Sequence, residues 1–279
     1  MQNAFSVDVE DYYQVAAFGK IIRRDDWDKY ESRVVENTRR MLDLLDGPQT
    51  PVKATFFVLG YIAERHPELV PEVTARGHEI ASHGWGHQLV YELSESEFRD
   101  DVQRARDILR SQSGQEVIGY RAPSFSIGKR TPNAHQILAE VGYRYDSSVF
   151  PIHHDIGGDA SAPLEIHEIA TPSGVIQEFP PTVFRFLRQN IPTGGGGYFR
   201  FFPYFVTKMM LRRVNAVGRP FVFYIHPWEI DPDQPRIADA PLKSRFRHYI
   251  NLRQTAARLQ KLFADFTFGT IQDVLGGPC

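Results

Sequence analysis

The sequence of 279 residues contains a single cysteine, Cys279, which is also its last residue. An intramolecular disulfide is therefore excluded, and so is a zinc site built from clustered cysteines. No stretch approaches the roughly 18 consecutive apolar residues that suggest a membrane-spanning helix. The first residues, Met1 to Ala4, lack the basic and apolar regions of a secretory signal peptide. Together these absences predict a cytoplasmic protein without a membrane span.

Neither sign of charge is in large excess, because the formal net charge is −2 at pH 7. Such a balance gives no reason to expect nucleic acid or an anionic membrane as a partner. Hydrophobic residues make up 42% of the chain and charged residues 24%, which is ordinary for a protein with a sizeable core. The length suits one large α/β domain or two small ones.

Strand and helix patterns alternate along most of the chain. Alternating or continuous apolar runs predict strands at residues 4–9, 53–59, 79–82, 117–120, 143–146, 164–170, 175–179, 221–225 and 266–271. Helical spacing predicts helices at residues 31–46, 61–75, 131–142, 203–216 and 245–264, and one that begins after a capping box at Ser94. This order predicts a parallel sheet or a barrel. Because of the polar residues at the strand ends described below, we expect a single α/β domain over residues 1–279, built as a distorted (β/α) barrel. Residues of about 150–200 would form an elaborated segment, with a helix–strand extension after about 230.

Two histidines four residues apart stand out in the segment from Ser82 to His87. Gly84 and Gly86 lie between the two histidines and favour a loop over a helix. A loop of this kind can direct the imidazoles of His83 and His87 to one metal ion. Taken alone, the segment could equally be a surface loop that happens to hold two histidines.

Polar residues recur at the carboxyl ends of the predicted strands. In (β/α) barrels the catalytic residues lie at this end of the strands. Each of these polar residues has an ordinary structural explanation, such as a capping carboxylate, a surface charge or a core histidine. Their occurrence in order at five strand ends favours a common site. The residues are Asp8, His83, Arg121, Asp146 and His226.

With these residues the chain resembles the polysaccharide deacetylase family, which is the NodB-homology domain or carbohydrate esterase family 4. The resemblance spans roughly residues 4–228 and looks closest to the branch of peptidoglycan deacetylases and allantoinase-like amidohydrolases. The stretch from Gly194 to Arg200 is also similar to deacetylases of exopolysaccharide systems. The matching motifs are the acidic cluster after the first strand, Ser82–His87, Arg121-Ala122-Pro123, Asp146-Ser147-Ser148 and Phe223–His226.

The resemblance implies a NodB-type barrel and a metal-dependent hydrolase. The enzyme would remove N-acetyl groups from an N-acetylated sugar in a polysaccharide or in its lipid-linked precursor. The implied roles are His83 and His87 as metal ligands, Asp8 as base, Arg121 as the partner that orients Asp8, and His226 as acid. Pro123, Asp146 and Trp228 would bind substrate.

The third metal ligand would come from Glu10 or Asp11. Strand alternation places Glu10 on the same side as Asp8, whereas aspartate is the usual ligand in the family. A bend after Val9 could bring Asp11 in instead, so both stay open. The ion would be divalent, with Zn²⁺ expected first and Co, Ni or Fe as alternatives.

Three further points follow from the sequence. Gly194 to Gly197 lacks the Lys-Ser/Thr of a phosphate-binding loop, and we expect a flexible loop there, with a lid or sugar platform as the alternative. Within hydrolases, cleavage of a non-sugar C–N amide such as a ring ureide is the rival function. The other rival is a catalytically silent carbohydrate-binding protein on the same scaffold.

Overall fold

A computed structural model describes residues 1–153 and 156–276, so that Cys279 lies outside the described residues. A sheet of nine strands crosses the molecule, and a separate hairpin of two strands lies beside it. The strands are β1 Gln2–Val9, β2 Thr55–Val58, β3 Glu79–Ser82, β4 Gly119–Tyr120, β5 Tyr145–Asp146, β6 His167–Thr171, β7 Gly174–Glu178, β8 Val183–Phe186, β9 Gln189–Pro192, β10 Val222–Ile225 and β11 Thr267–Gly269.

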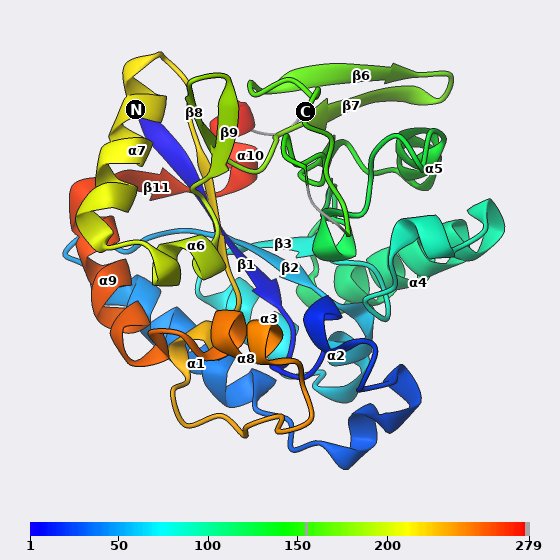
Figure 1. Ribbon diagram of the computed structural model, residues 1–279. Coiled ribbons are helices and arrows are strands. Elements are labelled where there is room, and N and C mark those ends of the chain that lie inside the picture. Colours follow the sequence, from blue (N-terminus) through cyan, green and yellow to red (C-terminus); the bar gives the residue numbers. More distant parts are fainter. Residues whose placement is uncertain (154–155, 277–279) are drawn as a thin grey trace.

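Helices follow most of these strands and cover the sheet (Figure 1). They are α1 Val34–Asp46, α2 Gly60–Arg65, α3 Leu69–Ala75, α4 Glu95–Ser113, α5 Ala134–Val141, α6 Gly196–Phe201, α7 Tyr204–Ala216, α8 Leu242–Tyr249, α9 Leu252–Asp265 and α10 Ile271–Leu275. The predicted capping box is present at α4, where the Ser94 hydroxyl accepts a hydrogen bond from the Glu97 backbone N–H. A short 3-10 helix at Pro227–Ile230 follows β10.

The sheet runs in the order β10-β1-β2-β3-β4-β5-β7-β6, with β11 also paired to β1. The strands from β10 to β7 pair in parallel, and only β6 runs antiparallel to its neighbour β7. Within the described residues no pairing joins β10 to β6, so the sheet stays open there. The outer edge of β10 is met instead by a single bridge between Gly195 and Tyr224.

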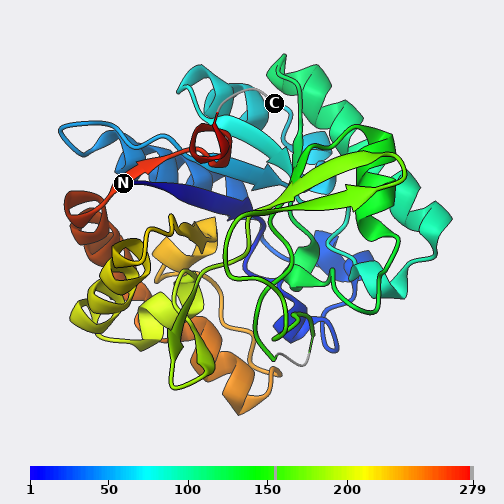
Figure 2. The same cartoon turned by 90° about the horizontal axis from the view of Figure 1, so that it is seen from above.

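The strand β1 lies next to β10 in this sheet and joins the two halves of the chain. Its parallel neighbour β10 comes from the second half, and its other neighbour β2 comes from the first (Figures 1 and 2). All of β1 except its first residue is buried. An inner strand buried on both faces is typical of parallel sheets covered by helices. Its carboxyl end therefore lies in the middle of the molecule, where the site forms.

Two predicted helices are each divided in the structure. The segment 61–75 forms α2 and α3, because His66 precedes Pro67 and adopts a non-helical conformation. The segment 245–264 forms α8 and α9, which are separated by Ile250 and by Asn251 in the left-handed region with φ of 53°.

The segment of residues 150–200 differs most from expectation. Its two predicted strands form the antiparallel hairpin β6–β7, and the hairpin β8–β9 was not predicted. The expectation of a flexible loop at Gly194 to Gly197 is wrong, because Gly195 bridges to β10 and Gly196 begins α6. The helix α10 was also not predicted.

Candidate active site

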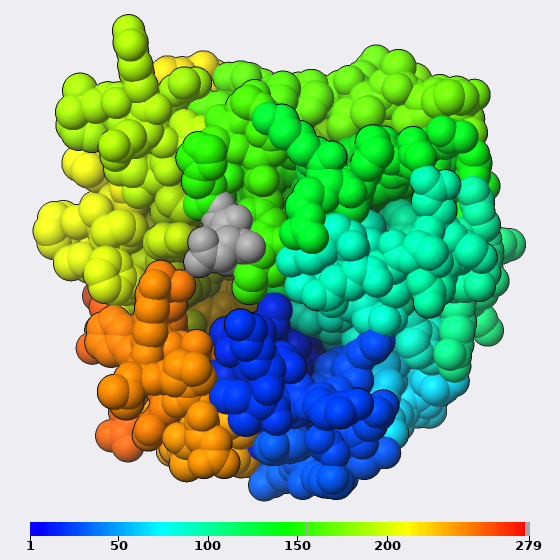
Figure 3. Space-filling model, turned by 45° about the vertical axis from the view of Figure 1, so that its right-hand side comes forward, coloured from blue at the N-terminus to red at the C-terminus, as the bar shows by residue number. Residues whose placement is uncertain are grey.

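The carboxyl ends of β1, β3, β4 and β10 meet at one edge of the sheet, because these strands pair in parallel. A cavity of about 450 Å³ lies there, within the range of small-molecule sites. Figure 3 shows this face hollowed where the N-terminal, green and orange segments meet. Its lining includes Asp8, Glu10, His83, His87, Tyr198, Tyr224, His226, Trp228 and Glu229.

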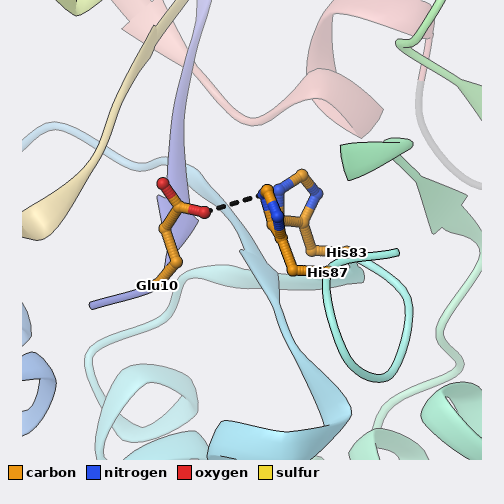
Figure 4. A group of neighbouring side chains, drawn as sticks. All are labelled: Glu10, His83 and His87. Atoms are coloured by element: carbon orange, nitrogen blue, oxygen red, sulfur yellow. Dashed lines mark ion pairs between the residues drawn. The ribbon is translucent and has the colours of Figure 1, made fainter. Parts of the chain in front are cut away.

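At the inner end of this cavity, Glu10, His83 and His87 bring one ligand atom each to within 4.8 Å of one another (Figure 4). Oε2 of Glu10 lies 2.8 Å from Nε2 of His87. Nδ1 of His83 is 2.8 Å from the backbone carbonyl oxygen of Arg121, and this contact fixes the orientation of the ring. The other ring nitrogen, Nε2, is then the one that can coordinate a metal ion. Two imidazoles and a carboxylate form a common donor set for a divalent transition metal.

The electrostatics of this cluster also fit a metal ion. Burial, together with the neighbouring His87, lowers the pKa of His83 to about 3, so that its imidazole is neutral as a ligand must be. Burial by itself would raise the pKa of Glu10, but His87 and His226 outweigh it, and the net shift keeps Glu10 ionised. Oε2 of Glu10 is buried, and Nε2 of His87 lies 2.8 Å from it. A cation bound by both side chains would lie between these two atoms.

Of the two acidic candidates, the structure brings Glu10 and not Asp11 to the histidines. The carboxylate of Asp11 accepts hydrogen bonds from the Ser32 hydroxyl at 2.6 Å and from the Arg33 backbone N–H at 2.9 Å. Burial raises the pKa of Asp11 to about 6. The side chains of β1 alternate between the two faces of the sheet, and this alternation continues to Glu10, one residue beyond the strand. Asp11 therefore points to the opposite side, where its hydrogen bonds hold the segment before α1.

Asp8 is held by Arg121, as the resemblance implies. Nη1 of Arg121 donates to Oδ1 of Asp8 at 2.6 Å and to the hydroxyl of Ser6 at 2.8 Å. Its other nitrogens donate to the hydroxyl and carbonyl of Ser147, and the guanidinium lies over the ring of Phe57. The arginine is completely buried, so one oxygen of Asp8 is fixed while Oδ2 faces the cavity.

Across the cavity, His226 presents its Nε2 to this pair of carboxylates. The distances are 3.5 Å to Oε1 of Glu10 and 4.0 Å to Oδ2 of Asp8. Burial alone would lower the pKa of His226, but the carboxylates of Glu10 and Glu229 outweigh it and raise the pKa to about 9. The imidazole also stacks on the ring of Trp228, with centroids 5.2 Å apart.

Two site residues were missed by the sequence reasoning, namely Glu229 and Arg200. Oε1 of Glu229 lies 2.8 Å from Nδ1 of His226, and its Oε2 accepts from Nε of Arg200 at 2.6 Å. Arg200 is buried and also donates to the carbonyls of His248 and Ile250. The available signal was the sequence His-Pro-Trp-Glu, in which a proline-started turn returns the glutamate to the histidine.

The three predicted substrate-binding residues lie in different places. Trp228 lines the cavity, and its Nε1 donates to Glu10 at 3.3 Å. Pro123 is buried and starts a short turn whose neighbours Ala122 and Ser124 line the cavity. The structure does not bring Asp146 to the cavity or to His226.

Asp146 belongs instead to a second buried cluster. Its Oδ2 lies 3.0 Å from Nε2 of His135, and Oε2 of Glu178 lies 3.9 Å from the same nitrogen. The hydroxyl of Ser148 donates to the other oxygen of Asp146. These contacts hold the Asp146 carboxylate in the second cluster, which explains why it does not line the cavity.

Comparison with known proteins divides the chain into two parts. Residues 25–145 match the family described as "Polysaccharide deacetylase", and residues 147–276 match "Domain of unknown function (DUF3473)". A peptidoglycan-N-acetylglucosamine deacetylase of Bacillus cereus is 36% identical over 89 residues, which is 32% of either chain. The matched region therefore spans about a third of the length of that curated relative.

Solved structures show the same fold over nearly the whole chain. A protein assigned as a polysaccharide deacetylase from Mycobacterium smegmatis has a TM-score of 0.61 at 24% identity, covering 97% of this chain and 87% of its own. The PuuE allantoinase has the same TM-score and coverage at 16% identity. These likenesses confirm the expected NodB-type α/β fold, although the described strands leave the sheet open. The chain therefore carries a polysaccharide deacetylase region over residues 25–145, followed by a DUF3473 region over residues 147–276, within one NodB-type fold.

Proposed function

We propose that the chain is a metal-dependent hydrolase that removes N-acetyl groups from an N-acetylated sugar in a polysaccharide or its lipid-linked precursor. The observation that carries this proposal is the cluster of Glu10, His83 and His87 beside Asp8 and His226 in one cavity. A divalent ion, with Zn²⁺ expected first, would supply Lewis-acid polarisation of the acetyl carbonyl and acidify water at the site.

The remaining steps fall to residues of the chain. Asp8 acts as the base, since its Oδ2 faces the cavity while Arg121 holds its Oδ1. His226 acts as the acid and gives the proton on its Nε2 to the leaving amine. Glu229 fixes the opposite nitrogen of that ring and stabilises its charged form, as a carboxylate behind a histidine does in other hydrolases.

The same site supports a single functional unit across the two matched regions. Glu10, His83 and His87 come from the first half of the chain, whereas His226, Glu229 and Arg200 come from the DUF3473 region. Because the β10–β1 pairing holds the two halves together, we take residues 1–279 as one domain. The aromatic side chains of Tyr198 and Trp228 give the cavity flat apolar surfaces that suit the C–H faces of a pyranose.

A direct comparison of substrates tests the proposal. The purified protein, supplied with Zn²⁺ or Co²⁺, should release acetate from chitooligosaccharides and should leave allantoin unopened. His83→Ala, prepared in parallel, serves as the control for metal-independent hydrolysis. Ring opening of allantoin without acetate release would favour the ureide hydrolase. Absence of any turnover in a metal-loaded protein that still binds the oligosaccharide would favour the silent carbohydrate-binding protein.

A further inference from the structure

Large apolar side chains project into solvent mainly from one region of the chain. Ten such residues are exposed in the described ranges 1–153 and 156–276, and only Met1 and Val175 lie outside the segment from 186 to 246. Exposed apolar patches of this kind mark interaction sites on soluble folds. The eight within that segment are Phe186, Leu187, Phe201, Phe205, Met209, Val217, Leu242 and Phe246.

The exposed residues follow the surface spacing of their helices. On α7, Phe205 and Met209 are four residues apart, with 72% and 47% of their surface exposed, and the basic residues Arg212 and Arg213 continue the same stripe. These residues line a shallow groove together with Lys208 and Ala216. On α8, Leu242 and Phe246 repeat the spacing, at 81% and 58% exposed.

Charge is concentrated in the same part of the chain. Residues 181–261 hold 14 of the 32 Lys and Arg residues but only 4 of the 34 Asp and Glu residues, a formal net charge of +10. The rest of the chain carries −12. The near-neutral total therefore conceals two regions of opposite sign, which is a sequence property associated with binding to polyanions or membranes.

In Figure 1 the hairpin β8–β9 and helices α6 and α7 lie in the upper left part of the molecule, and α8 lies below α6. In Figure 3 the yellow-green and orange segments occupy the left side, next to the hollowed face. The two features are adjacent because Tyr198 of α6 and Lys243 and Arg247 of α8 line the cavity. We call this side, made of β8–β9, α6, α7 and α8, the basic apolar face.

We propose that the basic apolar face binds the surface of an anionic lipid bilayer, with its apolar side chains at headgroup depth and its Lys and Arg residues against lipid phosphates. Helices with protruding Phe, Leu and Met beside basic residues bind in this interfacial manner. A second copy of the chain is disfavoured, because a two-fold contact would place two faces of the same positive charge together. Nucleic acid would account for the cations but not for the exposed Leu187 or Phe205.

Binding in this way keeps the mouth of the cavity at the membrane surface, where a lipid-linked glycan is presented. That consequence rests on the proposed function, whereas the lipid binding itself does not. The two are therefore tested by separate measurements.

Sedimentation with vesicles tests the surface directly. The whole protein should bind vesicles containing phosphatidylglycerol and not vesicles of phosphatidylcholine alone, and high salt should weaken the binding. Phe205→Ser with Met209→Ser should lower the partition coefficient at least tenfold, because apolar area is lost from the bilayer. Arg212→Gln with Arg213→Gln should lower it about 25-fold, since each cation near an anionic surface contributes about fivefold.

Matched variants serve as controls. Val175→Ser removes a comparably exposed apolar side chain from β7, and Arg110→Gln with Arg144→Gln removes two exposed arginines outside the face. Both should bind vesicles as the parent does. The circular dichroism spectrum and the thermal unfolding midpoint should be unchanged in all these variants, which shows that each is folded.

Three results would overturn the proposal. One is absence of binding to anionic vesicles by the folded protein. Another is vesicle binding that the Phe205→Ser/Met209→Ser pair leaves unchanged. Such binding would be explained by the attraction of the Lys and Arg side chains to any polyanion, without insertion of apolar side chains. The third is a stable dimer in light scattering that this same pair converts to monomer, which would identify a second copy as the occupant.

Discussion

At the scale of single residues, the two nitrogens of the His226 imidazole have different surroundings. Nδ1 is held by Glu229 at 2.8 Å, and Nε2 faces the carboxylates of the cavity. Burial by itself would raise the pKa of Glu229, but Arg200 and His226 outweigh it and lower the pKa to about 2. The glutamate is therefore ionised at neutral pH, and its charge supports the protonated imidazole that a general acid requires.

Removing that charge should slow amide hydrolysis selectively. In Glu229→Gln the side chain keeps its size but loses the charge that stabilises the imidazolium of His226. We expect kcat for N-acetyl substrates to fall by about 10² or more, which is the usual effect of losing a general acid. Hydrolysis of 4-nitrophenyl acetate should change less than about threefold, because nitrophenolate leaves without a proton. Parallel rate measurements on the two substrates check this.

Glu79→Gln is the matched control, because Glu79 is also a buried carboxylate but is bonded to Thr55 and Tyr145 away from the cavity. It should leave the ratio of amide to ester rates unchanged. An equal loss on both substrates in Glu229→Gln would show that Glu229 has only a structural role.

Metal retention should separate the two kinds of histidine in the site. His83→Ala removes one of three ligand side chains and should abolish retention of a divalent ion through desalting. His226→Ala should keep the ion and lose turnover, because His226 is not one of the three residues in the ligand cluster. Metal analysis of the untagged proteins measures both. Equal metal loss in the two variants would contradict the assignment of His226 as the acid.

At the scale of elements, the run of four glycines that leads into α6 allows the chain to approach the site closely. A Cβ at Gly195 would lie 2.4 Å from the ring of Tyr224, and one at Gly196 would lie 2.1 Å from Oε1 of Glu229. A Cβ at Gly197 would meet nothing within 4 Å. The first helical turn of α6 thus packs directly on the carboxylate that holds His226.

Alanine substitutions in this run should differ accordingly. Gly196→Ala should lower the free energy of unfolding by about 1–3 kcal/mol, the usual cost of overpacking, and should reduce turnover by displacing Glu229. Gly197→Ala is one residue away and should be neutral or slightly stabilising, since alanine favours a helix over glycine. Urea unfolding of both variants measures the difference. Equal effects would show that the contact with Glu229 is unimportant.

At the scale of the whole molecule, the second buried cluster links stability to pH. Burial by itself would lower the pKa of His135, but hydrogen bonds to Asp146 and Glu178 outweigh it and raise the pKa to about 10. Burial and the neighbouring Asp146 raise the pKa of Glu178. Both groups hold a proton more tightly in the folded protein than in the unfolded chain.

The sign of the pH dependence follows from these raised pKa values. Stabilisation by His135 is fully present below its unfolded pKa of about 6.5, and it is lost as pH rises to about 10. The free energy of unfolding should therefore fall over this window by up to about 1.4 kcal/mol per pH unit for the one proton. His135→Asn should flatten the curve. Urea titrations at several pH values measure it, and an unchanged slope in His135→Asn would contradict this assignment.

The sequence by itself determined most of the order of strands and helices, and it indicated several residues that the structure brings to one edge of the sheet. Apolar periodicity and the capping box at Ser94 are local properties, so their elements appear close to the predicted positions. His83, His87, Arg121 and His226 could be found because parallel strands bring their carboxyl ends to one edge.

Only the tertiary structure decided the remaining points, because each depends on contacts between distant segments. The choice of Glu10 over Asp11 as the carboxylate beside the histidines depends on Ser32 and Arg33, which donate hydrogen bonds to Asp11. The carboxylate of Asp146 contacts His135 and does not line the cavity. The role of the glycine run follows from the contact of α6 with Glu229, which no local pattern indicates. The basic apolar face could be recognised only after the exposed side chains were known. Sequence spacing carries no information on which of these long-range contacts form.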